Sequence, residues 1–194
     1  MPKMTKMPKK SSTEHEAIDP SSSPTLCPIA RGQGVVGDRW TVLVLRELFL
    51  GNRRFEEIQV QTQATPQMVA SRLKKLESDG LIERRLYSER PPRHEYHLTD
   101  MGVAFHPVFL AMRAWGETWL KSRNEEVAIQ YTHIPCGQDP GLGPTCQTCG
   151  KVMRREELSA RLSGSFDAER QARLNAFKPV ARSARRSRTP PSPP

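Results

Sequence analysis

Residues 65–80 read TPQMVASRLKKLESDG, and this stretch decides the fold. Thr65 is a favoured N-cap, and Pro66 suits the first helical position because no N–H is needed there. The apolar residues recur at the spacing of one buried helix face: Val69, Leu73 and Leu76. Gly80 favours the end of the helix. The pattern predicts an amphipathic helix over Pro66–Asp79 with one side open to solvent.

The open side of this helix carries hydrogen-bond donors and no acid. The polar residues opposite the apolar stripe are Gln67, Ser71, Lys74, Lys75 and Ser78, with Arg72 on the flank. Arg and Lys bond to phosphates or to guanine, and Gln pairs with adenine. A helix about 10–12 Å in diameter also fits the major groove of DNA. The helix is therefore predicted to recognise duplex DNA, although each residue taken alone also suits an ordinary solvated face.

Three helices are predicted on the N-terminal side of this stretch. Arg39–Leu50 is dense in apolar residues, is capped by Asp38 and ends at Gly51, which is typical of a core helix. A shorter helix is expected over about Arg54–Gln61. A short helical segment, Pro28–Val36, precedes both.

A basic hairpin is predicted on the C-terminal side. Alternation in Leu81–Leu86 and again in Glu95–Leu98 indicates two strands, joined by a long loop over Tyr87–Arg93. The loop carries Arg90 and Arg93, which can reach a phosphate or a narrow minor groove. Helix, short helix, polar-faced helix and basic hairpin stand in the order of a winged helix-turn-helix. The predicted fold class is mainly α with a small β-hairpin.

A long helical segment is expected from Thr99 to about Lys121, with a kink or break at Pro107. Its apolar stripe consists of Phe105, Phe109, Met112 and Trp119. Part of this stripe belongs in the domain's own core, but it exceeds what one small domain needs. One recognition helix covers few base pairs, so such proteins bind as dimers to the two half-sites of an operator. We expect residues 101–121 and Pro28–Val36 to form an isologous homodimer interface.

Composition sets the outer limits of this interpretation. The chain has 194 residues and a net charge of +9, and five of those charges lie in residues 178–194. The tail arginines, above all Arg182, Arg185, Arg186 and Arg188, are expected to add salt-sensitive, non-specific attraction to DNA. No apolar run suits a membrane span or a secretory signal, which favours a soluble cytoplasmic protein.

Four parts are predicted along the chain. They are a disordered arm (1–26), a winged helix-turn-helix and dimerisation domain (27–122), a Cys/His extension (123–165), and a short helix followed by a disordered basic tail (166–194).

The extension contains four potential metal ligands in two close pairs: His133, Cys136, Cys146 and Cys149. Glycines and prolines between the pairs predict turns rather than core. Four such ligands suit a tetrahedral structural zinc ion, which would stabilise a segment too small to fold by burial. Separate thiols, or a redox pair of Cys146 and Cys149, are the alternatives.

Eight short motifs resemble the HxlR-type transcriptional regulators in their order. They are CPIA (27–30), GDRW (37–40), LREL (45–48), GNRRF (51–55), RLKKL (72–76), GLI (80–82), PPRHEY (91–96) and LT (98–99). The resemblance covers residues 27–120 and implies a bacterial, homodimeric transcription factor on a near-palindromic operator. It implies that Pro66–Asp79 is the recognition helix and Tyr87–Arg93 the wing. Gln67-Met68-Val69 departs from the family's pattern, which leaves base preference open.

The expected DNA contacts combine the motif positions with the polar helix face and the wing. They are Arg53, Thr65, Gln67, Ser71, Arg72, Lys74, Lys75, Arg90 and Arg93. The expected partners are therefore double-stranded DNA and a second copy of the chain.

Cys27 stands alone before the first predicted helix. In a reducing cytosol an isolated cysteine is usually a small buried apolar residue. Some members of the resembling family use this cysteine as a thiol switch, and a helix N-terminus favours the thiolate. The resemblance implies a response to oxidants or electrophiles through Cys27.

Two other classes of function were weighed against a regulator. In the first, the extension is a zinc-knuckle adaptor that binds a protein partner, and the winged helix is its scaffold. In the second, Cys146 and Cys149 serve a thiol oxidoreductase. No strand–helix alternation surrounds that pair, and neither a phosphate loop nor a nucleophile with an assignable base is present. The sequence therefore predicts that the protein is not an enzyme.

Overall fold

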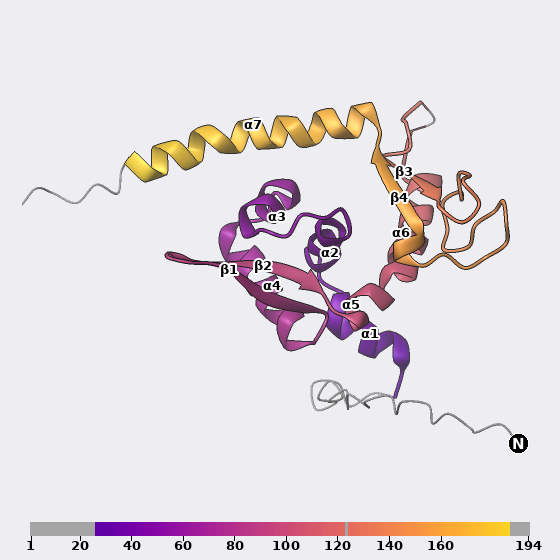
Figure 1. Ribbon diagram of the computed structural model, residues 1–194, viewed down its shortest axis with the longest axis horizontal. Coiled ribbons are helices and arrows are strands. Elements are labelled where there is room, and N and C mark those ends of the chain that lie inside the picture. Colours follow the sequence, from indigo (N-terminus) through magenta and orange to yellow (C-terminus); the bar gives the residue numbers. More distant parts are fainter. Residues whose placement is uncertain (1–25, 123, 187–194) are drawn as a thin grey trace, which may run out of the picture.

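The computed structural model describes residues 26–122 and 124–186 (Figure 1). The first half contains α1 (Pro28–Val36), α2 (Thr41–Phe49), α3 (Phe55–Thr62), α4 (Pro66–Ser78), β1 (Ile82–Glu89) and β2 (Pro92–Leu98). The second half contains α5 (Asp100–Ala104), α6 (His106–Trp119), β3 (Ile129–His133), a 3₁₀ turn (Arg155–Glu157), β4 (Leu158–Leu162) and α7 (Gly164–Arg186). The disorder predicted for residues 1–25 and 187–194 lies outside the described residues. Within them, no helix is both long and apolar enough to cross a membrane.

The first four helices agree with the sequence prediction. The ends of α2, α3 and α4 lie within two residues of the predicted bounds. Asp38 caps α2, since its Oδ1 accepts hydrogen bonds from the N–H groups of Trp40 at 2.9 Å and Thr41 at 3.1 Å. Thr65 caps α4, where its Oγ1 accepts from Met68 N at 3.3 Å. The predicted fold class, mainly helical with a small hairpin, is confirmed.

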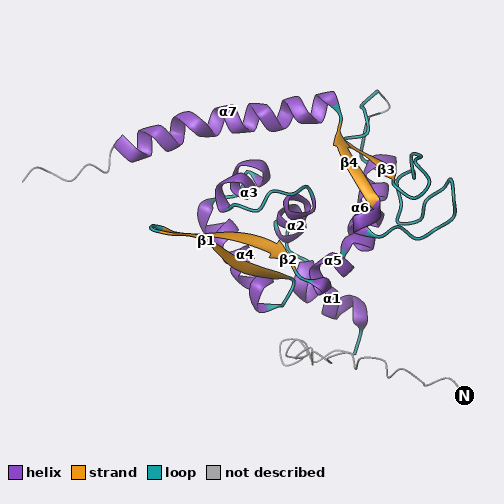
Figure 2. Ribbon diagram, viewed as in Figure 1, coloured by secondary structure: helices purple, strands orange, loops and turns teal. Residues whose placement is uncertain are grey.

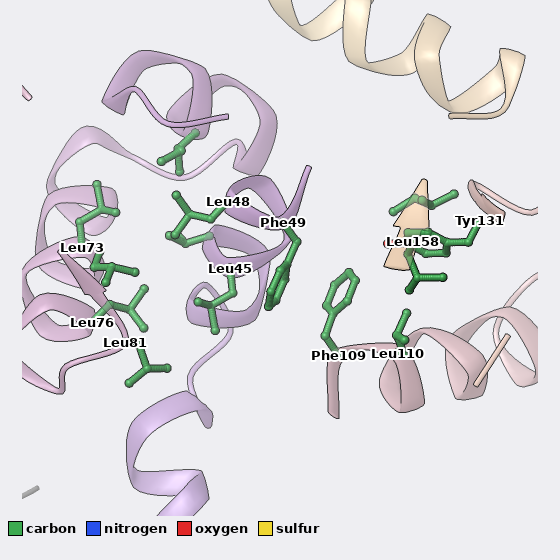
Figure 3. Close-up of a cluster of buried hydrophobic side chains, with 14 of the residues drawn as sticks. Leu45, Leu48, Phe49, Leu73, Leu76, Leu81, Phe109, Leu110, Tyr131 and Leu158 are labelled. Atoms are coloured by element: carbon green, nitrogen blue, oxygen red, sulfur yellow. The ribbon is translucent and has the colours of Figure 1, made fainter. Parts of the chain in front are cut away.

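The core of the winged helix lies among α2, α3 and α4 (Figure 3). Its fully buried side chains are Val44, Leu45, Ile58, Val69, Leu73 and Leu76. Phe49, at the end of α2, turns away from this group toward Phe109 of α6, and their ring centroids are 5.3 Å apart. This aromatic contact joins α6 to the winged helix.

The hairpin differs from the prediction at its tip. β1 and β2 pair antiparallel, and Glu89 lies opposite Pro92, so only Arg90 and Pro91 form the turn. The predicted long loop over Tyr87–Arg93 is therefore wrong. Proline is tolerated at the first residue of a strand, where no N–H is required for the ladder, and for this reason Pro92 does not interrupt the pairing.

The expected break before Pro107 is confirmed, because α5 ends at Ala104 and α6 begins at His106. Beyond α6, two short strands appear that the sequence did not predict. β3 pairs antiparallel with β4, and His133 lies opposite Leu158. We call residues 128–163, which contain this ladder and the Cys/His loops, the C-terminal module.

α7 is longer than the short helix predicted for the start of residues 166–194. It continues to Arg186, inside the stretch expected to be disordered. Its sequence is rich in Ala, Arg, Glu, Gln and Leu, which favour helix formation. α7 lies along α3 and crosses the winged helix on the side away from α4 (Figure 1).

Candidate nucleic-acid interface

The polar face of α4 points outward. Val69, Leu73 and Leu76 are buried, whereas Gln67, Ser71 and Lys74 are exposed, as the periodicity predicted. Thr65 is also exposed at the beginning of the helix. This surface offers an amide, a hydroxyl and an ammonium group on successive turns, which is the donor set that base edges and phosphates can accept.

Two basic residues of α4 already have acidic partners. Arg72 Nε lies 3.3 Å from Asp38 Oδ1, and Lys75 Nζ lies 2.7 Å from Asp79 Oδ2. Burial raises the pKa of Asp38, but hydrogen bonds from Thr41 and Trp40 and the charge of Arg72 together hold that pKa below its ordinary value. Arg72 therefore fastens α4 to the cap of α2. The sequence alone does not distinguish these paired cations from Lys74, which forms no ion pair among residues 26–122 and 124–186.

The arginines of the hairpin also divide into those with an acidic partner and those without one in the described chain. Arg84 Nε lies 3.7 Å from Glu77 Oε1, and Arg85 pairs with Glu83 on the same strand. Arg90 and Arg93 are exposed at the tip, and neither forms an ion pair within the described residues. The two arginines of the hairpin without ion pairs in the described chain thus lie at its tip, beside the exposed Glu89.

The base of the wing is attached to the start of α3. Arg53 O accepts a hydrogen bond from Tyr96 N at 2.9 Å, and Arg54 Nε lies 3.2 Å from Glu95 Oε1. The Arg54 guanidinium also stacks over the Tyr87 ring, 4.7 Å from its centroid. The side chain of Arg53 is exposed and has no ion pair in the described part of the chain. Arg53 therefore joins the wing tip and Lys74 as an available cation.

The aromatic stripe predicted for dimerisation divides into two groups. Phe109 is 7% exposed and packs on Phe49, and Phe105 is half-buried against the same core. These two belong to the intramolecular core, because α6 must bury one face against α2. Met112 and Trp119 are exposed by 51% and 73%. The structure adds two exposed residues at matching helical spacing, Val108 and Trp115.

Cys27 is exposed and immediately precedes α1, and its carbonyl oxygen accepts a hydrogen bond from Arg31 N at 3.1 Å. The prediction that it senses oxidants is not tested by this placement.

The four predicted metal ligands come together in the C-terminal module. His133 ends β3, and the cysteines lie on the loops that follow. The ligand atoms of the four residues all lie within 4.8 Å of one another. His133 Nδ1 lies 3.3 Å from Cys136 Sγ and 3.4 Å from Cys149 Sγ, and Cys136 Sγ lies 3.8 Å from Cys146 Sγ.

These distances fit a tetrahedral zinc ion. Zinc bonds to sulfur and imidazole nitrogen imply roughly 3.8 Å between two sulfurs and roughly 3.6 Å between sulfur and nitrogen. The His133 side chain is fully buried, and its Nε2 lies 3.9 Å from Glu157 Oε2, which is beyond hydrogen-bond distance. Burial raises the pKa of Cys146, but backbone N–H groups of Cys149 and Thr148 and the neighbouring thiols lower it to about 6. The cluster could therefore hold a metal.

Comparison with known proteins agrees with this arrangement. The HxlR-like helix-turn-helix family matches residues 35–124. An uncharacterised HTH-type transcriptional regulator of Mycobacterium tuberculosis is 38% identical over 135 residues, or 69% of this chain and 80% of that protein. An uncharacterised HTH-type regulator of Bacillus subtilis is 36% identical over 94 residues, or 48% of this chain and 73% of that protein.

Among solved structures, PA1607, a protein classed as a transcription factor, has a TM-score of 0.57 and 30% identity. The match covers 74% of this chain and 99% of that chain. The chain therefore belongs to the HxlR-like helix-turn-helix family, whose members are DNA-binding transcriptional regulators rather than enzymes.

Proposed function

We propose that the protein is a homodimeric, sequence-specific regulator that inserts α4 into the major groove of a near-palindromic operator. The supporting observation is the division of α4 into a buried apolar face and an exposed face with Gln67, Ser71 and Lys74. Four exposed cations without ion pairs in the described chain lie on or beside this helix and the wing: Arg53, Lys74, Arg90 and Arg93.

The proposal assigns different roles to these side chains. Gln67 and Ser71 contact base edges, because their amide and hydroxyl groups donate and accept at fixed positions. Lys74 and the wing arginines bind phosphates. Arg72 keeps its partner Asp38 and holds α4 against the start of α2, and Lys75 keeps its partner Asp79 within α4, which revises the prediction that both contact DNA directly.

The test starts from duplexes selected from a random pool by the full chain. Lys74→Ala should weaken binding to all duplexes and reduce the salt slope by about 1, since one phosphate contact is lost. Gln67→Ala should instead relax the preference at one position of the operator. Arg85→Ala is the matched control, because this arginine is paired with Glu83 on the hairpin. Wild-type binding by both the Lys74 and the Gln67 variants would contradict the proposed interface.

We propose that α6 forms the dimer contact. Val108, Met112, Trp115 and Trp119 form one exposed stripe. The opposite side of α6 is covered by the C-terminal module, because Arg113 donates hydrogen bonds to the carbonyl oxygens of Leu142 at 3.0 Å and of Ile129. Ile29 of α1 is 78% exposed and would extend the interface. A contiguous apolar stripe of this kind is typical of a protein–protein contact.

Sedimentation equilibrium tests this contact. The wild-type chain should be a dimer at micromolar concentration, and Trp115→Glu should be a monomer because a carboxylate would be buried in an apolar interface. Leu86→Glu is the control, since Leu86 is an exposed apolar residue on the hairpin, 53% exposed. A monomeric wild-type chain would contradict the dimer.

We propose further that His133, Cys136, Cys146 and Cys149 bind one structural zinc ion. Zinc would supply a cross-link between the end of β3 and the two cysteine loops. Metal analysis of protein purified without chelator should find one zinc per chain, and Cys149→Ser should reduce it strongly. Cys27→Ser should leave it unchanged. Well under one zinc in the wild-type protein would remove this part of the proposal.

The proposed response to oxidants is assigned to Cys27. Its support is the exposed position of this cysteine at the start of α1, which the proposed dimer interface includes. Diamide should release the wild-type protein from its selected duplex, and Cys27→Ser should abolish that release. Release that is unchanged in this variant would show that the switch lies elsewhere.

A further inference from the structure

The C-terminal helix is joined to the winged helix by a buried ion pair. Arg170 of α7 donates from Nη1 to Glu47 Oε1 at 3.0 Å and from Nη2 to Glu47 Oε2 at 2.7 Å. The Glu47 side chain, on α2, is completely buried, and the Arg170 side chain is 8% exposed. A bidentate arginine–carboxylate contact of this kind fixes both distance and orientation.

Glu47 is satisfied only when α7 is in place. Arg46 Nε and Asn52 Nδ2 each donate to its carboxylate at 2.7 Å, and Arg170 occupies the remaining positions. Without Arg170, the buried carboxylate keeps Arg46 as an ion-pair partner but loses two of its hydrogen bonds, which is unfavourable. Both arginine bonds depend on the same placement of α7, so even a partial displacement of the helix is unfavourable.

The docked helix also contacts the helix-turn-helix motif itself. Arg173 Nη1 donates to Gln61 O at 3.0 Å, and Gln61 Nε2 donates to Arg170 O at 3.2 Å. Gln61 lies in the last turn of α3, and the chain passes from there through Gln63 directly into α4. α7 thus supplies two hydrogen bonds to the turn before α4, and Arg46 Nη2 of α2 supplies a third, to Gln61 O at 3.2 Å.

The start of α7 follows β4, which pairs with the strand that carries His133 of the Cys/His cluster. His133 is the last residue of β3 and lies opposite Leu158, the first residue of β4. Ile134 N donates to Glu157 O at 2.8 Å, which extends this pairing by one step. β4 ends at Leu162, and α7 begins two residues later at Gly164. If His133 loses its fixed position, the β3–β4 ladder is disturbed at that end, and β4 leads directly to the start of α7.

From these contacts, we propose that metal occupancy of the cluster controls DNA binding by docking or releasing α7. With zinc bound, β3 and β4 stay paired and Arg170 stays on Glu47. After metal loss the ladder frays, α7 leaves α3, and the turn before α4 loses its support, so operator affinity falls. The docked and released states of α7 provide the two-state element that such coupling requires. The inference rests on the zinc site proposed above.

The test uses the full chain, zinc-loaded or stripped with a chelator, and a duplex selected by the zinc-loaded protein. Stripping should lower affinity for this duplex by roughly 5- to 150-fold, the usual range for coupled sites. Hydrogen exchange should increase in residues 55–65 and 166–177 at the same time, while the centre of α2 stays protected.

Arg170→Gln separates the coupling from metal binding. This variant should retain one zinc per chain, yet bind the duplex with the affinity of the stripped wild-type protein whether zinc is present or not. Arg161→Gln is the matched control, because Arg161 lies on exposed β4 and bonds only to Gln130 among the described residues. It should retain the full zinc dependence. If Arg170→Gln fails to fold, the double variant Glu47→Gln with Arg170→Gln removes the buried charge and carries the same expectation.

The outcomes are distinguishable. A wild-type chain that binds no zinc overturns the zinc site, and this inference with it. A chain that binds zinc, but whose affinity and exchange are unchanged by stripping, overturns the coupling and leaves the zinc site standing. Loss of zinc dependence in both Arg170→Gln and Arg161→Gln would also contradict the specific role of the Glu47 contact.

Discussion

The winged helix and the C-terminal module hold their shapes by different means. The winged helix buries a continuous apolar core from α2, α3 and α4, including Leu45, Ile58 and Leu73. The module is mostly loop, with one two-stranded ladder (Figure 2). Its fully buried side chains are few, and two of them, His133 and Cys146, belong to the polar cluster.

This contrast indicates which region can stand alone. Apolar burial stabilises the winged helix without any ligand, whereas a segment as small as the module needs a cross-link. The module should therefore depend on its cluster, and the winged helix should survive the loss of the module. Four measurements test this difference, beginning with the largest expected effect.

Cys146→Ser should unfold the module and spare the centres of α2 and α4 in the winged helix. Structural zinc contributes on the order of 10 kcal/mol to the folding of small sites. Hydrogen exchange should show lost protection across residues 128–163, with α2 and α4 unchanged. Cys27→Ser is the control. A module that stays protected, or a winged helix that unfolds with it, would remove the contrast between the two regions.

Arg170→Ala should destabilise the protein by about 3 kcal/mol, because the buried Glu47 carboxylate loses its bidentate partner and keeps only Arg46 as a cation. Urea denaturation followed by far-UV circular dichroism measures this change. Arg161→Ala, on the surface of β4, should cost less than about 1 kcal/mol. Equal effects of the two substitutions would mean that α7 is not held by its buried pair.

His106 lies between the two regions and therefore tests how they are joined. Its ring centroid is 4.8 Å from that of Phe49 in α2 and 6.5 Å from that of Tyr131 in β3. Burial, with a smaller effect from the charge of Arg155, lowers the pKa of His106 to about 4. The unfolded chain binds this proton near pH 6.5 and the folded chain does not. Stability should therefore fall by up to about 3 kcal/mol as the pH decreases from 6.5 to 4.

Thermal unfolding of wild-type protein and His106→Phe across this pH range measures the effect. The phenylalanine variant lacks the titrating ring. Its stability relative to the wild-type protein should therefore increase as the pH falls. Comparing the two proteins cancels the pH effects of all other groups, which both share. A difference that does not change with pH would show that His106 takes up its proton while folded.

Thr65→Ala should have the smallest effect, about 1 kcal/mol, because it removes the cap of α4. The change is confined to the winged helix and should leave zinc content unaltered. Ser78→Ala, at the exposed far end of α4, is the control and should be near neutral. Denaturant midpoints of the two variants provide the comparison.

Local patterns predicted most of the winged helix and few of the contacts between distant segments. Thr65, Pro66 and Gly80 marked the ends of α4 because capping and turn chemistry act within a few residues. Glu47 carries no local sign that its partner is Arg170, 123 positions away. Only the assembled fold brings that pair together.

The candidate site was also predicted only where local patterns decide it. Periodicity identified the outward residues Gln67, Ser71 and Lys74, but pairing with acids separates Arg72 from Lys74, and that depends on where Asp38 lies. Four ligands at suitable spacing, one histidine and three cysteines, indicated that these residues come together, as they do. The β3–β4 ladder beneath it was missed because each strand has only five residues.

The attachment of the hairpin to α3, through Tyr96 N to Arg53 O and Arg54 to Glu95, has a consequence for operator length. The hairpin is also joined to α4 by Arg84 and Glu77, so the wing and α4 move together. In the proposed dimer, one base pair inserted between the two half-sites would shift the contacts of one copy by about 3.4 Å and rotate them around the duplex axis. A copy whose wing and helix move together could not absorb that change, so tolerance for a longer operator would come from the joint between the two copies.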